Sequence, residues 1–207
     1  FLFLITPLVF TACMPDKTPI EPDPPNVILI MADDLGYETI GAYGGNSYQT
    51  PEIDRMAANG MRFEHCYAQP LCTPSRVKLM TGIYNVRNYV RFGLLDTTQT
   101  TFGHLFQGAG YATCIVGKWQ LGKDQKSPQQ AGFDNHCLWQ VSAGRVDETG
   151  RDTRFAKPVL DVDGQLKTYA DTDYGPEIVS NYGLDFIEKS HQDGKPFLLY
   201  YPMILTH

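Results

Sequence analysis

The sequence predicts an α/β protein with a mostly parallel central sheet flanked by helices. Two continuous apolar runs, residues 26–32 and 197–205, have the length and the branched or aromatic composition typical of strands buried on both faces. Between them, segments with helical spacing alternate with further strand-like runs, which is the pattern of α/β folds. A chain of 207 residues with 43% hydrophobic content can form one good-sized core, so we expect one domain or a part of a larger one.

Residues 1–25 precede this fold and suggest export. Residues 1–12 are mostly apolar but too few to span a bilayer as a helix, so we interpret them as a partial signal peptide that lacks its basic start. The segment ending at Cys13 resembles a bacterial lipobox, which predicts lipidation of Cys13 and a proline-rich tether over residues 13–25. We therefore expect an exported bacterial lipoprotein in the periplasm or outer membrane, attached to the membrane through its lipid anchor only. The alternative is an ordinary signal peptide with a chance cysteine.

Charge and cysteine content exclude two classes of protein. The net charge is −6 and no basic stripe is present, so nucleic acid is not an expected partner. The five cysteines lack the regular spacing of a disulfide framework or a zinc site. Cys66 and Cys114 lie in strand-like runs, where we expect buried thiols. Because the chain starts at Phe1 and stops at His207 directly after an apolar run, we expect it to be a fragment.

The first predicted strand runs into two neighbouring acids, Asp33 and Asp34. Side chains at the carboxyl end of a buried strand lie where open α/β sheets bind ligands. Adjacent side chains of a regular strand point to opposite faces, so both acids can bind one ion only if the strand breaks there, which Gly36 makes plausible. The alternative is a solvated turn in which aspartate is a common loop residue.

A helix and a further strand are expected next. Thr50 and the following proline are start signals, and Gly60 is a stop signal, with Ile53 and Met56 predicted to face the core. Residues 61–67 then read as a strand that leads towards Cys72.

Cys72 directly precedes a second predicted helix start. Thr73 can cap that helix, Pro74 suits its first position, and Gly82 is a natural stop. Cys72 would then lie at a positive helix end whose unpaired N–H groups favour an anion, and Arg76, one turn further on, can reach back to the same place. The alternative for a lone cysteine is a small buried hydrophobic residue.

The remaining elements continue the alternation of helix and strand. Their predicted order is a helix over 100–109, a strand over 111–116, a polar surface excursion over 140–173 with a hairpin turn at Asp163-Gly164, a helix over 174–192 and the strand over 197–205.

Three of these segments together resemble type I sulfatases. The run CTPSRVKLMTG from Cys72 to Gly82 is similar to the family's signature, in which a maturation enzyme oxidises the cysteine to formylglycine. The strand that ends at Asp33 and Asp34 is similar to the family's opening strand, whose paired aspartates bind calcium. The run GKWQLG, residues 117–122, is similar to the sulfatase GKWHLG, whose lysine and histidine line the sulfate pocket.

The resemblance implies an alkaline-phosphatase-like fold, with residues 26–207 as the N-terminal part of the catalytic domain. It implies hydrolysis of a sulfate monoester in a small molecule or polysaccharide, in which one hydroxyl of a hydrated formylglycine attacks sulfur and the other collapses to the aldehyde and expels sulfate. The implied catalytic residues are Cys72, Arg76, Lys118 and His207, the substrate contacts are Lys118, Gln120 and His207, and one Ca²⁺ is held by Asp33, Asp34 and the modified Cys72.

Two departures limit that implication. Gln120 stands where the family has histidine, and an amide can form hydrogen bonds but cannot act as a base near neutral pH. Two carboxylates and one modified side chain underfill a calcium shell of roughly 6–8 oxygens, so we expect this chain alone to be inactive. The alternatives are a phosphatase or phosphodiesterase of the same fold, and a surface lipoprotein that binds sulfated glycans with an impaired site.

Overall fold

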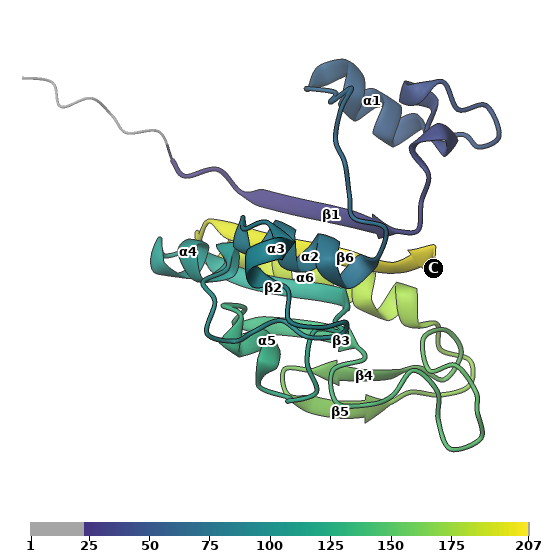
Figure 1. The fold of residues 1–207 in the computed structure, drawn as a ribbon, viewed down its shortest axis with the longest axis vertical. Helices are drawn as coiled ribbons and strands as arrows, with labels where there is room; N and C mark the ends of the chain where they lie inside the picture. Colours follow the sequence, from purple (N-terminus) through teal and green to yellow (C-terminus); the bar gives the residue numbers. More distant parts are fainter. Residues whose placement is uncertain (1–22, 207) are drawn as a thin grey trace, which may run out of the picture.

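A six-stranded sheet is the centre of the molecule in the computed structural model, which describes residues 23–206 (Figure 1). The strand order is β1-β6-β2-β3-β4-β5; the first four strands are mutually parallel, and the β4–β5 hairpin adds on antiparallel. The strands are β1 (Val27–Asp33), β2 (Ala112–Lys118), β3 (Asn135–Trp139), β4 (Val159–Val162), β5 (Gln165–Thr168) and β6 (Phe197–Thr206). The predicted α/β class is confirmed. The predicted signal peptide, Cys13 and His207 lie outside the described residues.

Helices cover both faces of this sheet. They are α1 (Pro51–Asn59), α2 (Cys72–Thr81), α3 (Asn85–Asn88), α4 (Phe102–Gly108), α5 (Ser127–Gln130) and α6 (Gly175–Gln192), with short 3-10 turns at Tyr37–Thr39 and Gly41–Tyr43. The helix predicted over 174–192 is confirmed as α6. Within residues 23–206, none of the helices combines the length and apolar character that crossing a bilayer requires.

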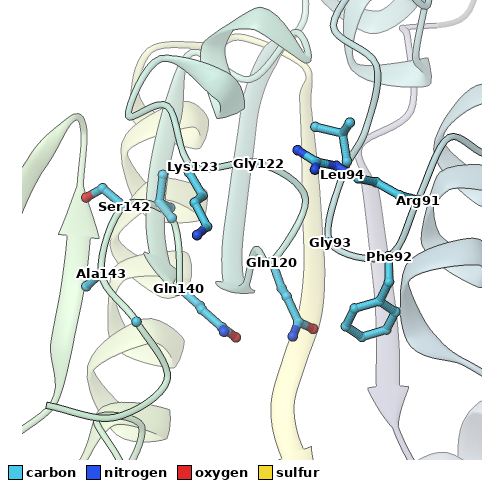
Figure 2. A pocket seen from close by; sticks show the side chains of 12 residues that line it. Arg91, Phe92, Gly93, Leu94, Gln120, Gly122, Lys123, Gln140, Ser142 and Ala143 are labelled. Carbon is cyan, nitrogen blue, oxygen red and sulfur yellow. The ribbon is translucent and has the colours of Figure 1, made fainter.

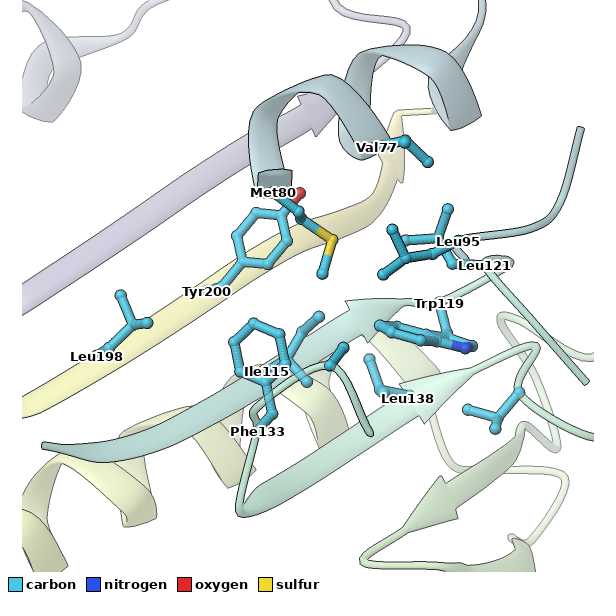
Figure 3. Close-up of a cluster of buried hydrophobic side chains, with 12 residues drawn as sticks. Val77, Met80, Leu95, Ile115, Trp119, Leu121, Phe133, Leu138, Leu198 and Tyr200 are labelled. Atoms are coloured by element: carbon cyan, nitrogen blue, oxygen red, sulfur yellow. The ribbon is translucent and has the colours of Figure 1, made fainter. Parts of the chain in front are cut away.

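The two faces of the sheet form two separate apolar clusters. On one face, Ile115 and Tyr200 pack with Val77 and Met80 of α2 (Figure 3). On the other face, Cys114 and its neighbours pack with α6. Because side chains alternate along a strand, the central strands β2 and β6 contribute to both clusters. The buried residues Val77 and Met80 attach α2 to the sheet.

The prediction that the first strand is buried on both faces is wrong. β1 is one of the two edge strands of the sheet among the described residues, and Ile28 and Ile30 are 51% and 58% exposed. α1 is held away from the sheet (Figure 1), and its predicted inner residues Ile53 and Met56 are also exposed. An apolar pattern indicates which side chains can be buried, but it does not specify which element covers them.

The segment between α1 and α2 is an exposed loop and not the predicted strand. Cys66 is exposed in this loop, so its prediction as a buried thiol is wrong. Cys114 is buried as predicted. Cys137 on the neighbouring strand β3, for which no burial was predicted, is buried too. Burial raises the pKa of the Cys137 thiol to about 12, so this thiol stays protonated and unreactive.

The polar region after β3 is only partly the predicted surface excursion. The turn at Asp163-Gly164 is confirmed, with positive φ angles of 51° and 83° at its two residues. The hairpin nevertheless extends the central sheet, because β4 pairs with β3 and buries Leu160 and Asp161. Strand β3 itself was not predicted from the sequence.

Candidate active site

Three chain segments meet at one end of the parallel strands. Asp33 is the last residue of β1, Lys118 is the last residue of β2, and Cys72 is the first residue of α2. The carboxyl end of a parallel sheet is the usual ligand-binding end of an open α/β fold. The topology therefore brings together three residues that are far apart in the sequence.

Lys118 is the centre of this group. Its ammonium forms an ion pair with Asp33 Oδ2, and the side chains of Lys118 and Asp33 are only 3% and 9% exposed. The same ammonium lies 3.5 Å from Cys72 Sγ, and that sulfur lies 3.6 Å from Gln120 Oε1. Asp33, Lys118, Cys72 and Gln120 are thus linked by successive contacts, with the cysteine between a cation and an amide.

The start of α2 differs from the predicted start in detail. The helix begins at Cys72, and Leu71 occupies the capping position without a side-chain hydrogen bond. Thr73 Oγ1 instead accepts a hydrogen bond from the Gly93 N–H at 3.2 Å, and Pro74 lies at the third helical position. The predicted stop at Gly82 is confirmed, with a left-handed φ of 67°. Cys72 therefore lies within the first helical turn, where N–H groups point towards an anion.

Arg76 is one turn further along α2 and is 2% exposed. Its Nη1 donates to the backbone carbonyls of Lys118 and Trp119. Its Nε and Nη2 are buried without a hydrogen-bond partner among the described residues. An unpaired buried donor is costly, so two such N–H groups on a fixed cation suit an anion or a polar ligand.

Asp34 was predicted to share a calcium ion with Asp33. The strand does break there, but through a left-handed φ of 58° at Asp34 itself and not through Gly36. Thr206 Oγ1 donates to the Asp33 and Asp34 carbonyls at 3.0 and 3.3 Å. Within residues 23–206, no group of three or more acidic, histidine or cysteine side chains could hold a metal. The described residues therefore fit a calcium ion only as a partial set of oxygen donors.

Tyr200 lies in the core below the site and does not act as an acid or base. Burial raises the pKa of its phenol to about 12, with a further contribution from Asp33 that Arg76 opposes. The neutral hydroxyl points to Met31 Sδ at 3.6 Å. Its role is packing.

A cavity of about 550 Å³ opens beside Gln120 (Figure 2). Its lining includes Arg91, Lys123 and Gln140, none of which the sequence analysis identified. Their position depends on how the loops after β2, β3 and α3 meet. No local signal in the sequence marks them.

The fold and the site define an α/β protein of the alkaline-phosphatase-like class whose site suits an anion. The sequence matches the model of the Sulfatase family over residues 25–207. This protein belongs to the sulfatase family.

Relatives and solved structures agree with this assignment. The chain is 34% identical to N-acetylgalactosamine-6-sulfatase of Sus scrofa, over 90% of this chain and 40% of the relative. It is also 34% identical to N-acetylglucosamine-6-O-sulfatase of Bacteroides thetaiotaomicron, over 88% of this chain and 31% of the relative. A structure solved in complex with its substrate D-glucosamine-2-N,6-O-disulfate superposes with a TM-score of 0.74 at 31% identity, covering 88% of this chain and 35% of that chain. The chain thus spans less than half the length of these proteins.

Proposed function

We propose that the protein hydrolyses sulfate monoesters, with a formylglycine made from Cys72 as its nucleophile. The observation that carries this proposal is the position of the Cys72 sulfur, 3.5 Å from Lys118 Nζ on the first turn of α2. A buried thiol of purely structural role needs no cation beside it. Family membership and the signature around Cys72 support the same reaction.

Arg76 and Lys118 are the residues that bind the sulfate in this proposal. When hydrated, formylglycine supplies a geminal diol that can attack sulfur and later release sulfate. The unpaired Nε and Nη2 of Arg76 donate to that diol or to a sulfate oxygen. Lys118 adds a second fixed cation, and because both cations are buried their attraction for an anion is little screened by water.

We also propose that Asp33 and Asp34 provide two of the oxygen donors of one calcium ion, with the other donors supplied from outside residues 23–206. The position of Asp33 at the end of β1, in contact with the Lys118 ammonium, supports a cation-binding role for its carboxylate. His207 follows β6 directly in the sequence and is proposed to protonate or orient the leaving oxygen.

The proposed substrates are sulfated saccharides. Relatives named for 6-O-sulfated amino sugars, and a structure solved with a disulfated glucosamine, support this class. From the sequence alone we propose lipidation at Cys13, export to the periplasm or outer membrane, and dependence on a formylglycine-generating enzyme.

Mass spectrometry of the peptide containing Cys72 tests the proposal, after co-expression of the full-length protein with a formylglycine-generating enzyme. We expect formylglycine at position 72 and release of inorganic sulfate from N-acetylglucosamine 6-sulfate. Cys72→Ser should reduce sulfate release by at least about a thousandfold, because serine has a single hydroxyl and cannot expel sulfate by collapse to an aldehyde. The matched control Cys66→Ser changes an exposed cysteine of the neighbouring loop and should leave the rate unchanged. An unmodified thiol at position 72 in an active preparation would refute the proposal.

Gln120 favours a second candidate, a glycan-binding protein with an impaired site. Its amide lies next to Cys72 at the position where the family signature has a base. Such a protein would form at most one equivalent of desulfated saccharide per formylglycine and would keep the sulfate on residue 72, whereas an enzyme shows steady turnover after the first equivalent. Rapid-quench measurement of the desulfated saccharide and of free sulfate distinguishes the two.

A further inference from the structure

The cavity beside Gln120 differs in charge from the rest of the molecule. Its lining contains two charged side chains, Arg91 and Lys123, and both are cations, although the whole chain has a net charge of −6. Both are exposed, and neither has an ion pair or hydrogen bond from its side chain within residues 23–206. Two unpaired cations in one cavity without an acid favour an anion.

The walls of this cavity are positioned by backbone contacts to the Cys72 site. Gly93, two residues after Arg91, donates its N–H to Thr73, the neighbour of Cys72. Leu95 is buried and donates its N–H to the Leu121 carbonyl at 2.8 Å. The loop that carries Arg91 is therefore attached both to α2 and to the loop that carries Lys123, so the cavity and the reacting residue keep a fixed relative position.

Two glutamines at the cavity are held in unusual backbone conformations. Gln120 and Gln140 have positive φ angles of 45° and 65°, and the Gln120 N–H donates to the Gln140 carbonyl at 3.1 Å. Figure 2 shows both amides projecting from the ends of their strands in the same direction. Left-handed conformations of residues other than glycine are uncommon and concentrate at functional sites.

The side-chain oxygen of Gln140 is a buried acceptor at this cavity. This atom, Oε1, has no hydrogen-bond partner among the described residues. A buried acceptor without a partner is unfavourable unless a ligand or solvent provides a donor, and a sugar hydroxyl is such a donor. Phe92, which also lines the cavity, is 49% exposed and offers a ring on which the apolar face of a pyranose can pack.

We propose that this cavity binds a second anionic group of the substrate, either a second sulfate or a carboxylate, so that the preferred substrate is a saccharide with at least two negative charges. Arg91 and Lys123 bind the second anion, Gln120 and Gln140 bind ring hydroxyls, and Phe92 packs on the ring. The sulfate that is hydrolysed lies at Arg76 and Lys118. This assignment of substrate class rests on the proposed function of the Cys72 site.

Calorimetric binding to the full-length Cys72→Ala protein tests the proposal, because that variant cannot turn the ligand over. The three probes are N-acetylglucosamine 6-sulfate, D-glucosamine-2-N,6-O-disulfate and a 6-O-sulfated disaccharide that contains a uronate. We expect at least one of the doubly charged probes to bind about tenfold more tightly than the singly charged probe, and this preference should decrease as salt rises. Whichever of them binds more tightly identifies the second anion as sulfate or carboxylate.

Adding Arg91→Ala and Lys123→Ala should abolish the preference while the affinity for the singly charged probe changes less than about twofold. The control Lys195→Ala removes an exposed lysine just before β6, at the opposite end of the sheet, and should keep the preference. Equal affinity for all three probes, no binding of any probe, or a preference that survives the double substitution overturns the proposal. Failure of the proposed hydrolysis is observed separately, as absence of formylglycine and of sulfate release in the unsubstituted protein.

Discussion

Asp33 with Lys118 and Asp161 with His136 are two buried acid–base pairs on the same sheet, and their surroundings differ. Asp161 and His136 are both 0% exposed and are joined by a contact of 2.8 Å between Oδ1 and Nε2. The N–H of Gly164 in the hairpin turn donates to Asp161 Oδ1 at 2.9 Å. The pair is closed off by the hairpin, so no ligand can reach it, and its role is to attach the hairpin to β3.

The pair at Asp33 and Lys118 lies at the carboxyl end of its strands, beside Cys72 and the unpaired donors of Arg76. Burial of ionisable side chains is therefore common to a structural pair and to a candidate active site. The difference lies in position on the sheet and in neighbours that can still bind a ligand. The following changes test this difference, from the largest expected effect to the smallest.

His136→Phe should destabilise the fold most. It leaves the Asp161 carboxylate buried without its partner, and loss of one member of a buried pair costs about 3 to 5 kcal/mol. Urea unfolding should show this decrease in the free energy of unfolding, while sulfate release per folded molecule stays unchanged. A reduced rate in the folded fraction would place this pair in the active site.

Lys118→Met should reduce sulfate release strongly and stability only moderately. It keeps most of the apolar stem but removes the cation beside Cys72 and Asp33, so sulfate release should fall by about 10²–10³-fold, as for loss of one preorganised donor. The loss of stability should be smaller than in His136→Phe, because Asp33 lies at the open end of the sheet. A larger loss of stability in Lys118→Met than in His136→Phe, together with a larger loss of sulfate release in His136→Phe, would contradict the assignment of one pair to structure and the other to the active site.

Arg76→Lys tests whether the guanidinium shape matters in addition to its charge. Arg76 holds two backbone carbonyls and still has two free N–H groups, which an ammonium cannot reproduce. We expect a loss of about 1 to 3 kcal/mol in stability because buried carbonyls lose their donor, together with slower sulfate release. Arg87→Lys on the exposed side of α3 is the matched control and should change neither quantity.

Gln120→His is the smallest change and the one expected to increase activity. Histidine at this position adds an ionisable base next to residue 72, where the amide contributes hydrogen bonding only. Turnover should rise about tenfold and should acquire a dependence on pH near the ordinary histidine pKa of about 6.5. A pH–rate profile identical to that of the unsubstituted protein would show that release of sulfate does not need a base here.

Most elements of the fold could be predicted because their signals are local. The apolar runs of β1 and β6, the four-residue spacing of α6, the turn at Asp163-Gly164 and the stop at Gly82 each depend on a few neighbouring residues. The elements predicted wrongly depend on distant partners: the loop containing Cys66 has the residue types of a strand but pairs with no strand among residues 23–206. Pattern alone cannot supply that partner.

The residues of the proposed chemistry can be found from local sequence alone: a cysteine signature on a helix start, two acids after a strand and a lysine after another strand. The tertiary structure decided which of them meet. The ion pair of Lys118 with Asp33, the contact of Gln120 with Cys72 and the cavity containing Arg91 all join residues that are distant in the chain. The physical reason is that side-chain type and spacing act locally, whereas these contacts follow from strand order, which is fixed only when the whole sheet assembles.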